Sequence, residues 1–252
     1  FNDWKRTGHG HVSVVDAIAQ SCDVFFYDLA YKLGIDKIHK SLAFFQFGKK
    51  TGIDLSGELG GILPSREWKK NNKDEPWYRG ETLITGIGQG FMTASPIQLA
   101  LATAAIANKG QLLKPKVMMH SQSKEGEILL EQQKDALQIP IKDINNWELV
   151  IEGMKQTIYG KSGTAKRLNN KLNYTLAGKT GTAQVFGLDP EEEYIAENID
   201  ERLRDHALFT GFAPINNPQV AIAIIVENAG SGSSKACLLY TSDAADEGLG
   251  VD

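Results

Sequence analysis

Two short motifs, far apart in the 252-residue chain, contain residue types suited to acyl-transfer chemistry. The first, Ser21-Cys22-Asp23, places a hydroxyl and a carboxylate two positions apart. The second, Lys179-Thr180-Gly181-Thr182, combines an ammonium group, two hydroxyls and a glycine. A lysine on a strand can bind a carboxylate or keep a serine network short of protons, and the adjacent threonine can bind the same carboxylate. The glycine would let a substrate backbone lie against the strand.

Each motif also has a simpler interpretation. The apolar residues between Val12 and Leu33 follow the spacing of one helix, which would run straight through Ser21-Cys22-Asp23. A Lys-Thr-Gly triplet can recur by chance in a surface loop. A similar run, Lys161-Ser162-Gly163-Thr164-Ala165, precedes the second motif, but turn-like residues follow it. We therefore select Lys179 as the functional lysine.

The two Gly-Lys pairs do not form phosphate-binding loops, which require a glycine five residues before the pair. Lys155 and Asn173 occupy that position. The glycines Gly86 and Gly88 do not complete a dinucleotide-binding fingerprint, because Phe91 stands where the third glycine belongs. The sequence therefore supports no nucleotide site.

Composition narrows the classes of partner. The 27 basic and 31 acidic side chains give a net charge of −4 and a pI of about 5.8, which disfavours nucleic acid or an anionic membrane surface as the main partner. Two cysteines are too few for a disulfide framework. No apolar run reaches the roughly 18 residues of a membrane span.

Two predicted helical segments, over residues 12–33 and 96–108, have clear signals at both ends. The capping residues are Ser13 with Asp16 and Ser95 with Gln98, Pro96 takes the first helical position, and Gly34 and Gly110 mark the ends.

Two other stretches are predicted to lack regular structure. Glycine, proline, lysine and asparagine interrupt residues 47–79, so we expect extended loops there. Residues 121–146 are polar and irregular, which predicts a surface excursion.

The sequence of the last third of the chain predicts strands over residues 174–186, 206–212 and 219–226. The apolar run Val220–Val226 predicts a strand that is buried on both faces. The acidic residues 189–205 predict a solvated helix or loop. Helices first and antiparallel strands last predict an α+β fold, with an antiparallel sheet flanked by helices.

The order of these features resembles the transpeptidase domain of class B penicillin-binding proteins, and in particular their penicillin-binding protein 2 subfamily. Ser-x-Asp, a Gly-x-Gly-x-Gly cluster, a helix that begins Ser-Pro-Ile-Gln, and Lys-Thr-Gly on a strand follow one another as in that family. The most specific stretches, within a resemblance from residue 3 to about 232, are Gly8–Val12, Cys22–Tyr27, Thr51–Leu55, Pro64–Lys69, Pro76–Gly80, Gly86–Gly90, Ala177–Gly187 and Arg202–His206.

The resemblance implies a serine β-lactamase-like fold and a peptidoglycan D,D-transpeptidase. In this family a serine attacks the D-Ala-D-Ala bond of a stem peptide, releases D-alanine and passes the acyl group to a neighbouring amine. Transfer to water instead gives D-Ala-D-Ala carboxypeptidase activity, and β-lactams trap the acyl-enzyme. The implied roles are proton shuttle for Ser21, orientation for Asp23, carboxylate binding for Lys179 and Thr180, and contact with substrate for Gly181 and Thr182, whose amide is a candidate oxyanion donor.

One family motif is missing from the expected place. The nucleophile of the family lies in an S-x-x-K motif some tens of residues before S-x-[N/D], whereas twenty residues precede Ser21 and none completes it. Ser121-Gln122-Ser123-Lys124 matches the pattern, but it lies after Ser21 in a polar loop. We therefore expect residues 1–235 to be a partial transpeptidase domain that is inactive as it stands. Residues 236–252, which include Cys237, have neither helical nor strand period and are interpreted as a non-native or frame-shifted tail.

Three residues near the N-terminus could bind zinc: Asp3, His9 and Cys22 are a hard, a borderline and a soft ligand that this metal accepts together. A buried free cysteine beside a solvent-exposed histidine is the alternative. Several penicillin-binding protein 2 enzymes carry a structural zinc near the active site, and the resemblance places these residues on three of its four ligand positions. No cofactor is expected for catalysis.

The resemblance also implies partners and a location. The expected partners are stem peptides, β-lactams and a glycosyltransferase of the elongation machinery. The expected location is the inner membrane, with the catalytic domain on the periplasmic side. Two rivals remain: a β-lactam-sensing or β-lactam-hydrolysing relative, and a non-catalytic cell-wall scaffold.

Overall fold

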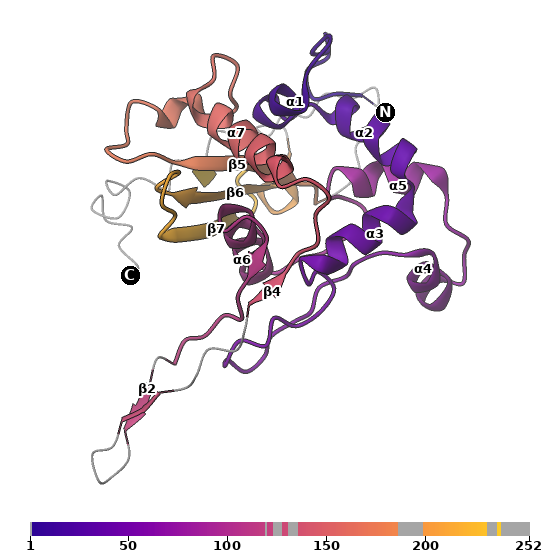
Figure 1. Ribbon diagram of the computed structural model, residues 1–252. Helices are drawn as coiled ribbons and strands as arrows, with labels where there is room; N and C mark the ends of the chain where they lie inside the picture. The colour runs from indigo at the N-terminus through magenta and orange to yellow at the C-terminus, as the bar shows by residue number, and fades with distance from the viewer. Residues whose placement is uncertain are drawn as a thin grey trace.

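The structure, a computed structural model, describes residues 2–118, 120–122, 128–130, 136–185, 199–230 and 236–237. Helices dominate the first part of the chain and the main sheet lies in the last part (Figure 1). The helices are α1 (Val14–Gln20), α2 (Asp23–Leu33), α3 (Ile35–Phe44), α4 (Arg66–Lys73), α5 (Arg79–Gly86), α6 (Pro96–Ala107) and α7 (Asn145–Tyr159), with short 3₁₀ turns at Lys166–Leu168 and Glu201–Leu203. The strands are β1 (Gln111–Leu112), β2 (His120–Gln122), β3 (Ile128–Leu130), β4 (Leu137–Gln138), β5 (Ala177–Ala183), β6 (His206–Ala213) and β7 (Val220–Val226).

The main sheet is antiparallel, in the order β5-β6-β7, with Lys179 opposite Thr210 and Phe209 opposite Ile224. Because side chains alternate along a strand, Phe209 and Phe212 of β6 lie on opposite faces. Phe212 packs in one buried cluster with α6 and α7. Phe209 packs in another, with residues that include Leu168, Leu176 and Cys237. The sheet therefore has an apolar core on each face, and the predicted α+β fold is confirmed.

The helices beside the sheet form a second layer. Helix α5 packs on α2 so closely that a Cβ at Gly86 would come 2.3 Å from the Cβ of Ala30. Helix α1 packs against α7, where a Cβ at Gly153 would come 2.8 Å from the Cβ of Ile18. These tight crossings fix α1, α2 and α5 relative to the sheet.

The expectation of extended loops over residues 47–79 is wrong for α4. Ser65 caps this helix by accepting a hydrogen bond from the Trp68 N–H at 3.0 Å. Helix α4 is strongly polar and has no apolar repeat for periodicity to detect. It is held instead by Lys69, whose side chain is 1% exposed and pairs with Glu81 of α5.

The expectation that Val220–Val226 is buried on both faces is also wrong. The residues of β7 are half-buried or exposed, and within the described chain β7 pairs only with β6. Helix α6 covers one of its faces. The apolar run predicted a strand correctly, but this strand lies at the edge of the described sheet. An apolar composition does not show how many neighbouring strands a strand has.

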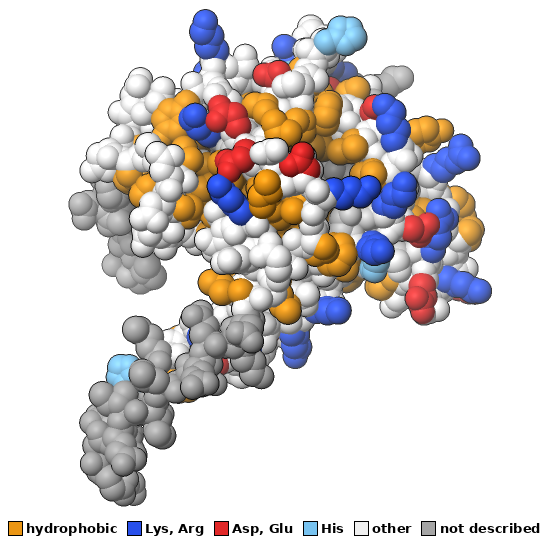
Figure 2. Space-filling view, in the orientation of Figure 1, with side chains coloured by type: hydrophobic (Ala, Val, Ile, Leu, Met, Phe, Trp, Pro, Cys, Tyr) orange, Lys and Arg blue, Asp and Glu red, His pale blue; other side chains and the backbone are white. Residues whose placement is uncertain are grey.

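Other predictions are confirmed. Both capping boxes form, at Ser13 with Asp16 and at Ser95 with Gln98, and Pro96 opens α6. The surface excursion predicted over residues 121–146 agrees with an arm in which β2 pairs with β3 and which projects away from the body in Figure 1, but the expected lack of regular structure is wrong for β2, β3 and β4. Lys and Arg side chains are interspersed with Asp and Glu over the face seen in Figure 2.

Some predictions fall on residues that the structure describes only in part. Most of the acidic stretch 189–205 and of the tail 236–252 lies outside the described residues, as do Ser123 and Lys124. Ala236 and Cys237 are buried in the Phe209 cluster. No described helix combines the length and the apolar character that a membrane span requires.

The most consequential departure is the break between α1 and α2, where helical periodicity alone predicts one continuous helix. Ser21 adopts a left-handed conformation with φ of 56°. The N–H of Ser21 bonds to the Ile18 carbonyl at 3.3 Å and the N–H of Cys22 to the Ala17 carbonyl at 2.9 Å, which is the Schellman pattern of a helix end. Glycine usually takes this position, so a serine gives no sequence signal of the break.

This geometry predicts that Ser21→Gly is more stable than Ser21→Ala by about 1 kcal/mol. Both variants lack the hydroxyl, but only glycine adopts the left-handed conformation without steric cost. Urea unfolding of the intact protein that contains this chain measures the difference. At residue 19, within α1, the order should be reversed: Ala19→Gly should be less stable than the protein with Ala19. Equal stability of the two Ser21 variants would contradict the left-handed geometry.

Candidate active site

The fold brings the two predicted motifs together. Lys179 on β5 places its Nζ 2.8 Å from the Oγ of Ser21, although the two residues are 158 positions apart. The same ammonium group donates to the backbone carbonyl of Thr180 at 2.7 Å. The break between α1 and α2 is what turns the Ser21 hydroxyl toward the sheet, so the site exists only because the helix is interrupted.

The charges of the site are shifted by burial. Burial lowers the pKa of Lys179 to about 8, and the negative charge of Asp23 opposes the shift. Burial also raises the pKa of Asp23, against the hydrogen bond from the Trp4 N–H and the charge of Lys179. A lysine with such a pKa can exist in both protonation states near neutrality, as a proton-transfer group must.

The run around Lys161 contributes to the site through a different residue. Thr164 places its hydroxyl oxygen 2.7 Å from that of Thr180, and its N–H donates to the Ala19 carbonyl at 3.2 Å. Lys161 lines a small polar pocket of about 160 Å³ with Asp16 and other residues of α1 and α7. Thr164 has no role that the sequence alone predicts, because only the tertiary fold places it beside the strand.

Trp4 is a second residue of the site that no sequence pattern indicates. Its indole Nε1 donates to the Ser21 carbonyl at 2.9 Å and to the Gln20 carbonyl at 3.1 Å. Its backbone N–H donates to the Asp23 carboxylate at 3.2 Å. The N-terminal segment thus lies across the helix break and satisfies carbonyls that the end of α1 leaves open.

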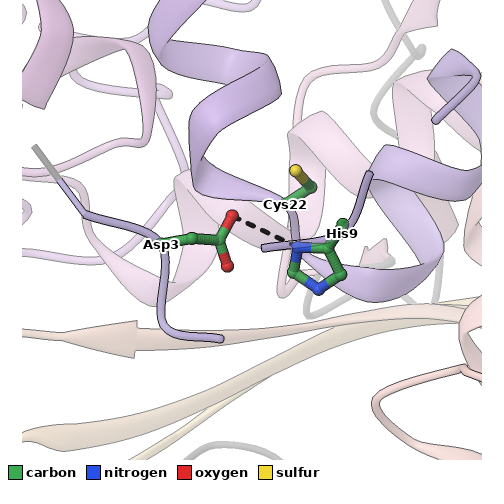
Figure 3. A group of neighbouring side chains, drawn as sticks. All are labelled: Asp3, His9 and Cys22. Carbon is green, nitrogen blue, oxygen red and sulfur yellow. Dashed lines mark ion pairs between the residues drawn. The ribbon is translucent and has the colours of Figure 1, made fainter. Parts of the chain in front are cut away.

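The three candidate zinc ligands also meet (Figure 3). The ligand atoms of Asp3, His9 and Cys22 all lie within 4.8 Å of one another. The side chains of His9 and Asp3 are 1% and 4% exposed, so the alternative of a solvent-exposed histidine is wrong. His9 Nδ1 lies 3.2 Å from Asp3 Oδ2 but is a buried nitrogen without a hydrogen-bond partner among the described residues.

In this cluster the pKa of Asp3 is lowered, whereas the pKa of Cys22 is raised. Burial acts to raise the pKa of Asp3, but hydrogen bonds from the N–H groups of Lys5 and Val24 outweigh it, and the pKa is lowered. Burial and the neighbouring Asp3 carboxylate raise the pKa of the Cys22 thiol. The arrangement is an ionised carboxylate, an unsatisfied imidazole nitrogen and a thiol, a donor set that suits zinc.

A glutamine from the glycine cluster completes the site. Gln89 follows α5 and donates from its side-chain amide to the Thr182 carbonyl on β5 at 3.1 Å. Thr182 is exposed, so this end of the strand is open to solvent. The glycine cluster was recognised in the sequence, but nothing in its spacing reported which strand it would contact.

The lowered pKa of Lys179 predicts a pH dependence of stability. Between pH 8 and the ordinary value of 10.5, the unfolded chain binds a proton at this lysine that the folded chain has lost. The free energy of unfolding should therefore rise with pH across this window, by an amount that Lys179→Met lacks. Urea unfolding of the intact protein and the variant across the window measures it, with Lys161→Met as a charge-matched control. A difference between the two proteins that stays constant with pH would refute the lowered pKa.

Comparison with known proteins places this geometry in a family. The sequence pattern described as "Penicillin binding protein transpeptidase domain" matches residues 1–241. Peptidoglycan D,D-transpeptidase MrdA of Escherichia coli K12 is 42% identical over 241 residues, which are 95% of this chain and 38% of that protein. The chain thus spans well under half the length of this relative.

Solved structures agree. The crystal structure of penicillin-binding protein 2 (PBP2) from Pseudomonas aeruginosa in complex with WCK 5153 matches with a TM-score of 0.82 and 45% identity, over 94% of this chain and 47% of that one. PBP2 from Helicobacter pylori, solved in complex with MreC, matches with a TM-score of 0.81 and 34% identity, over 95% of this chain and 41% of that one. By sequence and by fold, this chain belongs to the penicillin-binding protein transpeptidase domain family.

Proposed function

We propose that the intact protein containing this chain is a peptidoglycan D,D-transpeptidase of the PBP2 type. The observation that carries the proposal is the contact between Lys179 and Ser21 beside the exposed end of β5. It supplies a hydroxyl, a cationic group and a strand edge within one small region, which is what acyl transfer from a peptide carboxylate requires. The match to MrdA along 95% of the chain supports the same reaction.

Each residue of the site has a role in this proposal. The nucleophilic serine, from an S-x-x-K motif outside residues 1–252, gives its hydroxyl proton to the lysine of that motif, attacks the D-Ala-D-Ala carbonyl and forms an ester as the C–N bond breaks. The amine of a neighbouring peptide then takes the acyl group and frees the serine. Ser21 gives its hydroxyl proton to the departing D-alanine amine and is reprotonated from Lys179, which Asp23 helps to orient. Lys179 and Thr180 bind the terminal carboxylate, and Gly181 and Thr182 receive the substrate backbone, with the Thr182 N–H at the oxyanion.

The same proposal covers the wider setting. We expect the protein to act in cell elongation, anchored in the inner membrane with this domain on the periplasmic side. Its partners would be a glycosyltransferase and other elongation proteins, a view supported by the H. pylori PBP2 complex with MreC. Residues 1–252 alone would not acylate, and transfer to water would give carboxypeptidase activity as a side reaction.

Labelling with a fluorescent penicillin tests the enzyme. The intact protein should be labelled covalently, and Ser21→Ala or Lys179→Ala should slow labelling by about 10²- to 10⁴-fold, the usual contribution of positioned proton transfer. Lys161→Ala should label at the wild-type rate, since Lys161 lines the polar pocket and not the contact with Ser21. Thermal unfolding checks that all variants fold.

Different failures identify the rivals. An intact protein without an S-x-x-K motif that is never labelled would be a scaffold. Label that is rapidly lost as the β-lactam is hydrolysed would indicate a β-lactamase-like relative. Either result contradicts the transpeptidase proposal.

We also propose that Asp3, His9 and Cys22 hold a structural zinc ion, with a fourth ligand from outside this chain. The ion would supply electrostatic pairing for a buried carboxylate and thiolate and a ligand bond for His9 Nδ1. It would join the N-terminal segment, which carries Trp4, to the helix break that carries Ser21. Its role would thus be to hold the turn in place, without taking part in the chemistry.

Metal analysis of the intact protein should find about one zinc per chain, and a chelator should lower the midpoint of thermal unfolding. Cys22→Ser should lose the metal because the thiolate ligand is removed. Cys237→Ser is the matched control: it alters a buried cysteine in the Phe209 cluster and should retain zinc. Absence of zinc, with thermal stability indifferent to chelator, would contradict the proposal.

A further inference from the structure

The backbone at Gln89 is held by the end of α5. The Gly88 N–H donates to the Thr85 carbonyl at 2.9 Å and the Gln89 N–H donates to the Ile84 carbonyl at 3.1 Å. With φ of 78° at Gly88, this is again the Schellman pattern of a helix end. Gln89 is therefore presented to the sheet from a fixed point on a helix that packs against α2.

The acceptor of its amide lies at a strand edge. Within the described residues β5 pairs only with β6. The Thr182 carbonyl points toward Gln89 and hence away from β6. In an antiparallel strand, alternate residues direct their N–H and C=O to the same side, so the carbonyl of Thr180 faces the same edge.

Both of these edge carbonyls have donors from the chain itself. Lys179 Nζ donates to the Thr180 carbonyl at 2.7 Å, and Gln89 Nε2 donates to the Thr182 carbonyl at 3.1 Å. An extended peptide that adds to the edge of a sheet must donate its own N–H groups to such carbonyls. Substrate and side-chain donors therefore compete for the same edge.

We propose that Gln89 is a specificity-determining residue that occupies the Thr182 carbonyl until a ligand brings an N–H to replace it. The inference rests on the proposed function, because it takes the edge of β5 as the substrate strand position. A ligand that carries an amide N–H at this point regains the hydrogen bond that Gln89 gives up. A ligand without an N–H at this point leaves the Gln89 hydrogen bond in place, so Gln89 weakens only the binding of acyl donors that use the Thr182 carbonyl.

The hydrogen bond between Gln89 and the Thr182 carbonyl is weak enough for a ligand N–H to replace it. A neutral amide-to-carbonyl hydrogen bond contributes little net free energy in a solvent-exposed setting, because water competes for both groups. Gln89 is half-buried and Thr182 is exposed, so the bond can open without uncovering a buried polar group. The fixed backbone at the end of α5 returns the amide to the same carbonyl when the site is empty.

Acylation kinetics of the intact protein test the proposal with two β-lactams. Benzylpenicillin carries an acylamino N–H, whereas a carbapenem carries a hydroxyethyl group in its place. In Gln89→Ala and in Gln89→Met, the dissociation constant of the pre-acylation complex with benzylpenicillin should fall by about 2- to 10-fold, the range of one net hydrogen bond. The limiting acylation rate should stay at the wild-type value, and the dissociation constant for the carbapenem should change less.

Gln219→Ala is the matched control. Its side-chain amide also donates to a backbone carbonyl, that of Asn217 at 3.3 Å, but in the turn between β6 and β7. This variant should behave as wild type with both ligands.

The remaining outcomes overturn the proposal. A slower limiting rate in both Gln89 variants would mean that Gln89 positions the strand, and equal changes with both β-lactams would mean that the site is merely loosened. Unchanged constants would mean that the contact does not compete with ligand. These results all require a wild-type protein that acylates, whereas a wild-type protein that does not acylate refutes the proposed function itself.

Discussion

The hydrogen bond between Lys179 and Ser21 is the contact on which the site depends, because it joins the sheet to the helices across 158 residues of chain. Each partner is held by different elements. Lys179 lies on β5, which is paired to β6 along its length, and Ser21 lies at a break that α1, α7 and the N-terminal segment stabilise together. Neither half of the chain contains a site by itself.

The pKa values of two buried lysines shift in opposite directions because the two side chains have different hydrogen-bonding and charged partners. Lys69 is only 1% exposed, and burial alone would lower its pKa, but hydrogen bonds and charges from Glu81 and Glu75 raise it. Lys179 has a hydroxyl and a carbonyl as its hydrogen-bond acceptors, with the charge of Asp23 as an opposing influence, and its pKa falls to about 8. The first lysine is fixed as a cation that holds α4 to α5, whereas the second remains able to exchange a proton.

The sequence predicted the main residues of the site better than the elements and contacts that position them. Ser21, Asp23 and Lys179 were identified because the order of the motifs that contain them resembles that of a known family. The caps of α1 and α6 were found because their side chains bond to nearby backbone. Helix α4 was missed because it is held by a tertiary ion pair. Thr164, Trp4 and Gln89 were missed because their hydrogen-bond partners lie 16 or more positions away, where no local pattern reports them.

The two helices that end beside the site, α1 and α5, both end with a residue in the left-handed conformation, but the residue type differs. At the end of α5, Gly88 takes the left-handed position without strain and Gln89 follows it. At the end of α1, the residue in the left-handed position is Ser21, which must accept a steric cost that glycine would avoid. A glycine there would lose the hydroxyl that Lys179 contacts, and moving the serine by one position would turn it away from the strand. The strain at Ser21 is thus retained because the turn and the functional group have to be the same residue.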